Sequence, residues 1–136
     1  MPYAESIIEV DAGLVAGGAI KRGVAISIND SGEAVAAGSN KVTIGISLGV
    51  YEAGDTVSYA GVNSIVNCVA NGTSTSPGNG AITAGDFVGP AGSDGTLAKK
   101  DTAGDSIIGV AHSGTTAANG TISVQVEPHA VATLTN

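Results

Sequence analysis

Short apolar runs separated by glycine-containing turns recur along the whole chain. Residues 19–28 show the pattern: Ile20, Val24, Ile26 and Ile28 are apolar, and small or polar residues stand between them. Runs of about four to eight such residues, bounded by turn formers, are typical of β-strands. No stretch has the period of about 3.6 residues, with caps, that an amphipathic helix requires. The pattern therefore predicts an all-β chain.

The boundaries of the expected strands follow from the turns. We predict strands over residues 6–10, 19–28, 33–37, 42–50, 56–59, 63–70, 82–88, 96–99, 107–111 and 121–127. Gly45 and Gly49 lie inside one of these runs, where glycine indicates a bulge or a close backbone approach. Pro128 is expected to end the last strand, because a proline inside a strand removes a donor from the ladder.

The same order of strands and turns occurs twice. The matched segments are residues 19–24 with 81–86, residues 31–34 with 94–97, residues 44–46 with 108–110, and residues 53–59 with 118–124. The offset grows from 62 (Ile20 to Ile82) to 65 (Thr56 to Thr121), and each added residue falls in a turn. Duplicated strands joined by loops of variable length are expected to show an offset that grows in this way.

The repeat predicts a division of the chain and a fold class. We expect an N-terminal arm (1–12), β repeat 1 (13–70), a linker loop (71–80), β repeat 2 (81–129) and a polar tail (130–136). The fold class is all-β, a duplicated small β-barrel or sandwich unit with an extended N-terminal arm and pseudo-two-fold-related strands. Because each repeat is close to the lower size limit for independent folding, the halves are expected to share a core or to borrow one from a partner chain.

The expected core consists of apolar residues inside these strands. They are Ile20, Ile26, Val35, Ile44, Ile46, Val57, Val66, Cys68, Ile82, Phe87, Leu97, Ile108, Val110, Ile122 and Val124. Cys68 is the sole cysteine, which excludes an intrachain disulfide. A free cysteine in an apolar run behaves as a small buried hydrophobe, so we do not expect a reactive thiol there.

Composition and charge narrow the possible partners. Five basic residues stand among twelve acidic ones, for a net charge of −7, which argues against direct binding of nucleic acid, since that relies on Lys and Arg neutralising phosphates. No apolar span is long enough for a membrane helix, and no secretory signal is evident, so we expect synthesis in the cytoplasm and no membrane partner. Aromatic residues are 3% of the chain, and oligomerisation commonly supplements so modest a core.

Candidate chemistry is sparse. The sequence contains the residue types of a Ser/His/Asp triad in Ser113, His112 and Asp105. A catalytic triad is defined by geometry rather than by composition. The two histidines and one cysteine lack the spacing of zinc motifs. Residues 29–33 resemble part of a calcium loop, yet with Asp30 as position one the ligand at position twelve would fall at Lys41. We therefore expect no catalytic, cofactor-binding or metal-binding residues, and a protein that is not an enzyme.

The repeat unit itself resembles a known family. Ile20 and Gly23, followed by residues 31–36, 44–46 and 53–58, resemble the capsid cement (decoration) proteins of tailed bacteriophages. The second copy is similar, and the two copies together cover most of residues 16–126. The resemblance implies a structural protein on the outer surface of the icosahedral head, at junctions between major capsid subunits, without catalytic residues. It implies the major capsid protein as partner and a place in the virion. This chain departs from the family in carrying two copies of the unit, and we separately expect self-association as a homotrimer.

The resulting hypothesis is a structural cement protein that stabilises the head against internal pressure. A protein that binds the assembled shell but not its free subunits stabilises the shell by mass action. The alternative is a carbohydrate-binding or adhesive β domain exposed on a virion or cell surface. Such sites commonly stack sugars on aromatic rings, and this chain has four: Tyr3, Tyr51, Tyr59 and Phe87.

The N-terminal arm is the candidate partner-binding segment. Residues 6–10 are strand-capable and stand outside both predicted repeats. Strand addition to a neighbouring chain uses main-chain hydrogen bonds for affinity, so we predict that Tyr3, Ile7, Ile8 and Val10 anchor the arm on the capsid or on a sister subunit. The alternative is an edge strand that completes the fold of its own chain.

Overall fold

The computed structural model describes residues 3–71, 81–100 and 104–130. Most of the predicted linker loop and tail, residues 72–80 and 131–136, therefore lies outside the described residues. The described part contains ten strands and no helix, which confirms the all-β prediction. In this part of the chain no helix has the length and apolar character needed to cross a membrane.

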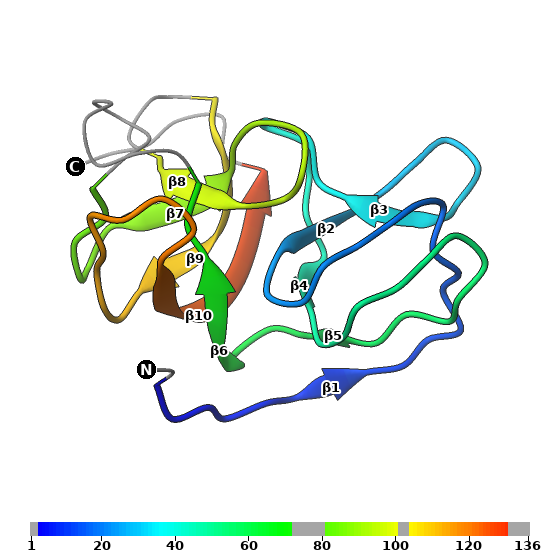
Figure 1. Cartoon of the computed structure of the whole chain (residues 1–136), viewed down its shortest axis with the longest axis horizontal. Helices are drawn as coiled ribbons and strands as arrows, with labels where there is room; N and C mark the ends of the chain where they lie inside the picture. Colours follow the sequence, from blue (N-terminus) through cyan, green and yellow to red (C-terminus); the bar gives the residue numbers. More distant parts are fainter. Residues whose placement is uncertain (1–2, 72–80, 101–103, 131–136) are drawn as a thin grey trace.

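The strands form two five-stranded antiparallel sheets that lie next to each other (Figure 1). The first sheet, in spatial order, is β1 (Glu9–Val10), β5 (Tyr59–Ala60), β4 (Gly45–Ser47), β2 (Ala25–Ile28) and β3 (Ala34–Ala36). The second is β6 (Ile65–Val69), β10 (Thr121–Ala130), β9 (Ser106–Ala111), β7 (Phe87–Pro90) and β8 (Leu97–Lys99). We call residues 3–62 the first unit and residues 63–130, as far as described, the second unit.

The two sheets have the same strand order: adding five to each strand number of the first sheet produces the order of the second. Their registers also correspond. Ile26 lies opposite Gly45 in the first sheet, and Val88 lies opposite Gly109 in the second. The same parallel bridge closes each unit, between Ala16 and Ala34 in the first and between Ala70 and Leu97 in the second. Residues that occupy the same place in the two registers are called equivalent below.

Strand pairing differs from the expected organisation at the N-terminus. We predicted that the strand over residues 63–70 closes the first half and that residues 1–12 stand outside the repeat. In the structure β6 opens the second sheet, and β1 has the equivalent place in the first, since Val10 pairs with Tyr59 as Val66 pairs with Val124. Each sheet therefore begins with a strand that pairs with the last strand of its own unit.

The expected end of the last strand at Pro128 is wrong. β10 continues through Pro128 to Ala130, and its register against β9 shifts between Val126 and His129. An irregularity of this kind leaves a residue without a regular ladder partner. The missing N–H of Pro128 is tolerated there, which is why the strand does not stop.

Each unit has apolar residues at equivalent interior positions. The first unit buries Ala16, Ile20, Val24, Ile26, Ala34 and Val57 in one cluster. The equivalent residues of the second unit, among them Ala70, Ile82, Val88, Leu97 and Ile122, belong to a larger cluster. That cluster also contains Ala25, Ala37, Ile46 and Ala60 from the first unit. The core of the second unit therefore contains residues from both units, because one face of the first sheet packs against it.

Most of the predicted core is buried. Eleven of the fifteen residues are buried: Ile20, Ile26, Ile46, Val57, Val66, Cys68, Ile82, Leu97, Ile108, Ile122 and Val124. The prediction is wrong for Val35, Ile44, Phe87 and Val110, which are half-buried. Phe87 and Val110 lie opposite each other in the second sheet. Phe87 and Val110 are half-buried because the other unit, as far as the structure describes it, does not cover the face that carries them.

The predicted pseudo-two-fold relation between the halves is also wrong. Ala25, Ile46 and Ala60 are 0% exposed, whereas their equivalents Phe87, Val110 and Gln125 are partly exposed. A two-fold axis would bury equivalent residues equally. The units therefore meet head to tail, with one surface of the first unit on a different surface of the second.

Candidate partner-binding surface

The N-terminal arm crosses the edges of both units (Figure 1). Ser6 exchanges two backbone hydrogen bonds with Ile65 at the edge of β6, at 2.9 and 2.7 Å. Glu9 and Val10 then pair with β5 in the first sheet. The arm thus lies on its own chain, as in the alternative that we considered, and joins the two units along one side.

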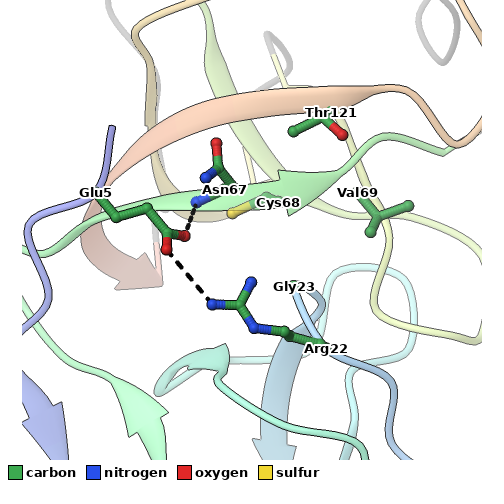
Figure 2. Close-up of a pocket in the computed structure, with 7 residues that line it drawn as sticks. All are labelled: Glu5, Arg22, Gly23, Asn67, Cys68, Val69 and Thr121. Carbon is green, nitrogen blue, oxygen red and sulfur yellow. Dashed lines mark hydrogen bonds and ion pairs between the residues drawn. The ribbon is translucent and has the colours of Figure 1, made fainter. Parts of the chain in front are cut away.

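Asn67 and Glu5 hold the start of the arm (Figure 2). The backbone N–H of Tyr3 donates to Asn67 Oδ1 at 3.0 Å, and Asn67 Nδ2 donates to the Tyr3 carbonyl at 2.8 Å. The backbone N–H of Asn67 donates to Glu5 Oε2 at 2.8 Å, while Arg22 Nη2 lies 3.4 Å from Glu5 Oε1. The carboxylate therefore links β6 to the first unit. Because the Arg22 side chain is 47% exposed, the ion pair itself adds little stability.

A cavity of about 440 Å³ opens beside this contact. Its lining is Glu5, Arg22, Gly23, Asn67, Cys68, Val69 and Thr121, drawn in Figure 2. Cys68 is buried, and this burial, with a smaller contribution from Glu5, raises the pKa of its thiol. The thiol stays protonated and is a poor nucleophile. Among the residues that the structure describes, no three His, Cys, Asp or Glu side chains gather in a way that could hold a metal ion.

The arm presents apolar side chains to solvent. Of the predicted anchors, Tyr3, Ile7 and Ile8 are 42%, 37% and 54% exposed, whereas Val10 is half-buried. Val62 is also 56% exposed, and it follows Gly61, whose N–H donates to the Ile8 carbonyl at 2.8 Å. Sequence reasoning missed Val62, because only the pairing of the arm with β5 brings it close to the arm. Whether the four predicted residues anchor a partner stays a prediction.

The backbone of the arm has a second edge. Ser6 and Ile8 direct their backbone groups towards Ile65, Ser64 and Gly61. Successive residues of a strand direct these groups to opposite edges. Ile7 therefore directs its N–H and C=O away from β6, towards the outer side of the arm, where an added strand would pair.

The structure does not assemble the candidate triad. Asp105 and His112 flank the six-residue β9, and a strand of that length separates them by about 20 Å. His112 Nε2 instead lies 3.0 Å from Gln125 Oε1, and Ser113 Oγ accepts from the backbone N–H of Ser123 at 2.9 Å. Asp105 Oδ1 accepts from Asn40 Nδ2 at 3.2 Å, so the three side chains make separate contacts.

The calcium-like segment is a turn. Asn29 Oδ1 accepts from the backbone N–H groups of Ser31 and Glu33, at 3.0 and 2.9 Å, and Asn29 Nδ2 donates to Glu33 Oε1. An Asn side chain that bonds to the backbone two residues later mimics a turn. The oxygen that a calcium ligand would supply is used inside the loop.

The four aromatic residues do not form a platform for sugars. Tyr51 and Tyr59 are half-buried and pack against the core of the first unit, and the Tyr51 hydroxyl is hydrogen-bonded to the backbone of Ser58. Phe87 is half-buried in the second sheet, and Tyr3 is the exposed one. No two of the four rings are both exposed.

Comparison with known proteins finds a similarity in fold. No family model matches the sequence, and no match was found among curated proteins. The structure is similar to the N base of head fiber gp8.5 of bacteriophage phi29, with a TM-score of 0.62 over 98% of this chain and 100% of that chain. Sequence identity is 17%, so the likeness concerns the fold.

Proposed function

We propose that this protein is a structural, non-catalytic component of a bacteriophage head that binds the outer surface of the assembled shell. The supporting observation is the likeness, over nearly the whole chain, to the base of a phage head fiber. The cement-protein resemblance of the repeat unit supports the same class from independent evidence. The net charge of −7 is compatible with an outer surface away from the packaged nucleic acid.

The exposed arm is the proposed attachment site. Its outer backbone edge at Ile7 is available for strand addition to a major capsid subunit, and the side chains of Tyr3, Ile7 and Ile8 supply the apolar contacts. Because the arm is already held by Asn67 and β5, its conformation is largely set before binding. Preorganisation of this kind reduces the entropy lost on association.

A structural protein that binds the head surface has one of two roles. In the cement role, which we favour, a homotrimer bridges neighbouring capsid subunits and stabilises the shell, because it binds the shell and not its free subunits. In the second role the protein is the base of a head fiber and carries a further structure on the head; the phi29 protein is named as such a base. The two roles differ in their effect on the shell, not in where the protein binds.

Cosedimentation with heads tests the proposal. The wild type is expected to sediment with assembled heads and not with unassembled capsid subunits. Ile8→Asp, on the arm, is expected to weaken binding at least about tenfold, since it places a charge in the apolar contact. Val50→Asp is the matched control, because Val50 is 72% exposed and lies outside the arm. Point variants are preferable to deleting the arm, which also removes pairs with β5 and β6.

The thermal stability of the heads then separates the two roles. A cement protein raises the temperature at which heads release their contents, and the increase disappears with Ile8→Asp. A fiber base binds heads without this increase. A wild type that does not bind heads contradicts both roles.

A further inference from the structure

The contact between the units uses a defined face of the first sheet. We call this the outer face, the face that carries Ala25, Ile46 and Ala60 in the first unit. Leu48, at the end of β4, packs against the same cluster. In the second unit the equivalent face carries Phe87, Val110, His112 and Gln125. The described part of the chain does not cover it: His112 is exposed and the other three are half-buried.

The second unit contributes a different surface to the contact, which we call its tip. Gly95 accepts a hydrogen bond from the backbone N–H of Ala25 at 2.8 Å, and the N–H of Val69 donates to the Gly23 carbonyl at 2.9 Å. Ser106 Oγ donates to the Lys41 carbonyl at 2.6 Å. Pro90, at the end of β7, lies at the same contact, since its carbonyl is 3.5 Å from the backbone N of Asn40. These tip residues are Val69, Pro90, Gly95 and Ser106.

The first unit has an equivalent tip, and it is exposed. Register assigns Val15, Ile28, Gly32 and Val42 to the places of Val69, Pro90, Gly95 and Ser106. Three of them are large apolar side chains at the surface: Val15 is 40%, Ile28 42% and Val42 61% exposed. A single exposed apolar residue needs no explanation, but three at the positions of an existing contact point to a partner.

The matched glycines show the difference most directly. Gly32 and Gly95 have the same φ of 78°. A Cβ on Gly95 would lie 2.5 Å from the Ala25 carbonyl oxygen, whereas a Cβ on Gly32 would meet no atom within 4 Å. The first tip thus has the backbone shape of the second without the neighbour that fits it.

We propose that the tip of the first unit binds the outer face of the second unit in another copy of this chain, repeating between chains the contact that each chain makes internally. The inference rests on the self-association within the proposed function and names its surfaces. A groove of about 260 Å³, lined by residues that include Ile28, Val35 and Lys41, accepts the ring of Phe87, which is larger than the methyl of Ala25. A contact of this kind is heterologous, and it closes into a ring when the rotation between copies divides a full turn.

Complementation of two variants tests the proposal. Val42→Asp damages the first tip, and Val110→Asp damages the outer face of the second unit. The wild type is expected to self-associate in sedimentation equilibrium over the micromolar range, and each variant to associate at least about tenfold more weakly. An equimolar mixture of the two is expected to form a one-to-one dimer and nothing larger. Each such dimer has one intact contact, between the sound tip of one variant and the sound face of the other.

Controls show whether a loss of association is due to the proposed contact. Val50→Asp is expected to associate like the wild type, because Val50 follows β4 whereas Val42 precedes it, so the two lie at opposite ends of that strand. Circular dichroism checks folding, and exposed His112→Glu replaces Val110→Asp if that variant is unfolded. A monomeric wild type, variants that associate normally, or a mixture that stays monomeric would each overturn the inference. Head binding is measured separately, so a monomer that still binds heads overturns this inference and leaves the proposed attachment intact.

Discussion

The outer face of the first unit carries Ala25, Ile46 and Ala60, whereas the same positions of the second unit carry Phe87, Val110 and Gln125. Strand order and register are the same in both, so the backbone does not account for the difference. At two of the three places a small residue, Ala25 or Ala60, stands where the other unit packs, and the larger Phe87 or the polar Gln125 stands where it does not. At the third place both residues, Ile46 and Val110, are branched and apolar. The comparison shows that packing between the units, rather than topology, selects residues on this face.

The interior positions of the two units differ in which place carries the larger side chain. The first unit places Ile26 opposite Gly45 and closes its bridge with Ala34, whereas the second unit has Val88 and Leu97 at those places. The first unit has the larger side chain at one position and the second unit at the other. The summed side-chain volume is larger in the second unit, because Val88 and Leu97 together are bulkier than Ile26 and Ala34.

Truncating the matched isoleucines should produce the largest difference between the units. Ile108 is 0% exposed, whereas Ile44 is half-buried against the first core. We expect Ile108→Ala to lower the free energy of unfolding by about 2–5 kcal/mol and Ile44→Ala by about 1–2 kcal/mol. Urea denaturation of both variants measures this. Equal losses would mean that the shared core does not set the stability of the second unit.

Substitution of the equivalent glycines, Gly32 and Gly95, should produce a smaller difference in the free energy of unfolding. Gly32→Ala and Gly95→Ala both place a side chain at positive φ, at a cost of about 1 kcal/mol. At Gly95 the new methyl group also meets the Ala25 carbonyl across the contact between the units. We therefore expect Gly95→Ala to cost about 2–3 kcal/mol in total, measured as above. If both variants lost the same amount, the contact at Gly95 would not hold the units together.

The smallest expected effect concerns the residues that follow Val66 and Val10. Asn67 holds the arm through its side chain, whereas Asp11, its equivalent, is exposed. Asn67→Ala should cost about 1 kcal/mol and speed the amide hydrogen exchange of residues 3–8, while Asp11→Ala should do neither. Unchanged exchange in Asn67→Ala would show that backbone pairing with β6 alone holds the arm.

Part of the candidate partner-binding surface could be predicted from the sequence. Apolar residues at a strand-capable end indicated the arm, and three of its four predicted anchors are exposed. Val62 could not be found in this way, because it lies far from the arm in sequence and reaches it through β5. The place of the arm within the first sheet was also missed. Its sequence signal is short, Val10-Asp11 beside Val66-Asn67, and it is followed by extra residues in the first unit.

The sequence by itself determined the all-β class and the places of most strands, because alternation of apolar residues and glycine turns are local properties. It also aligned the halves: Ala34 with Leu97, Gly45 with Gly109 and Tyr59 with Val124 occupy equivalent places in the two registers. Only the tertiary structure decided that the units meet head to tail, that the described residues leave the face of Phe87 and Val110 uncovered, and that β10 continues past Pro128. Alternation determines which residues share a face of a strand, but whether that face is buried depends on which distant segment packs against it.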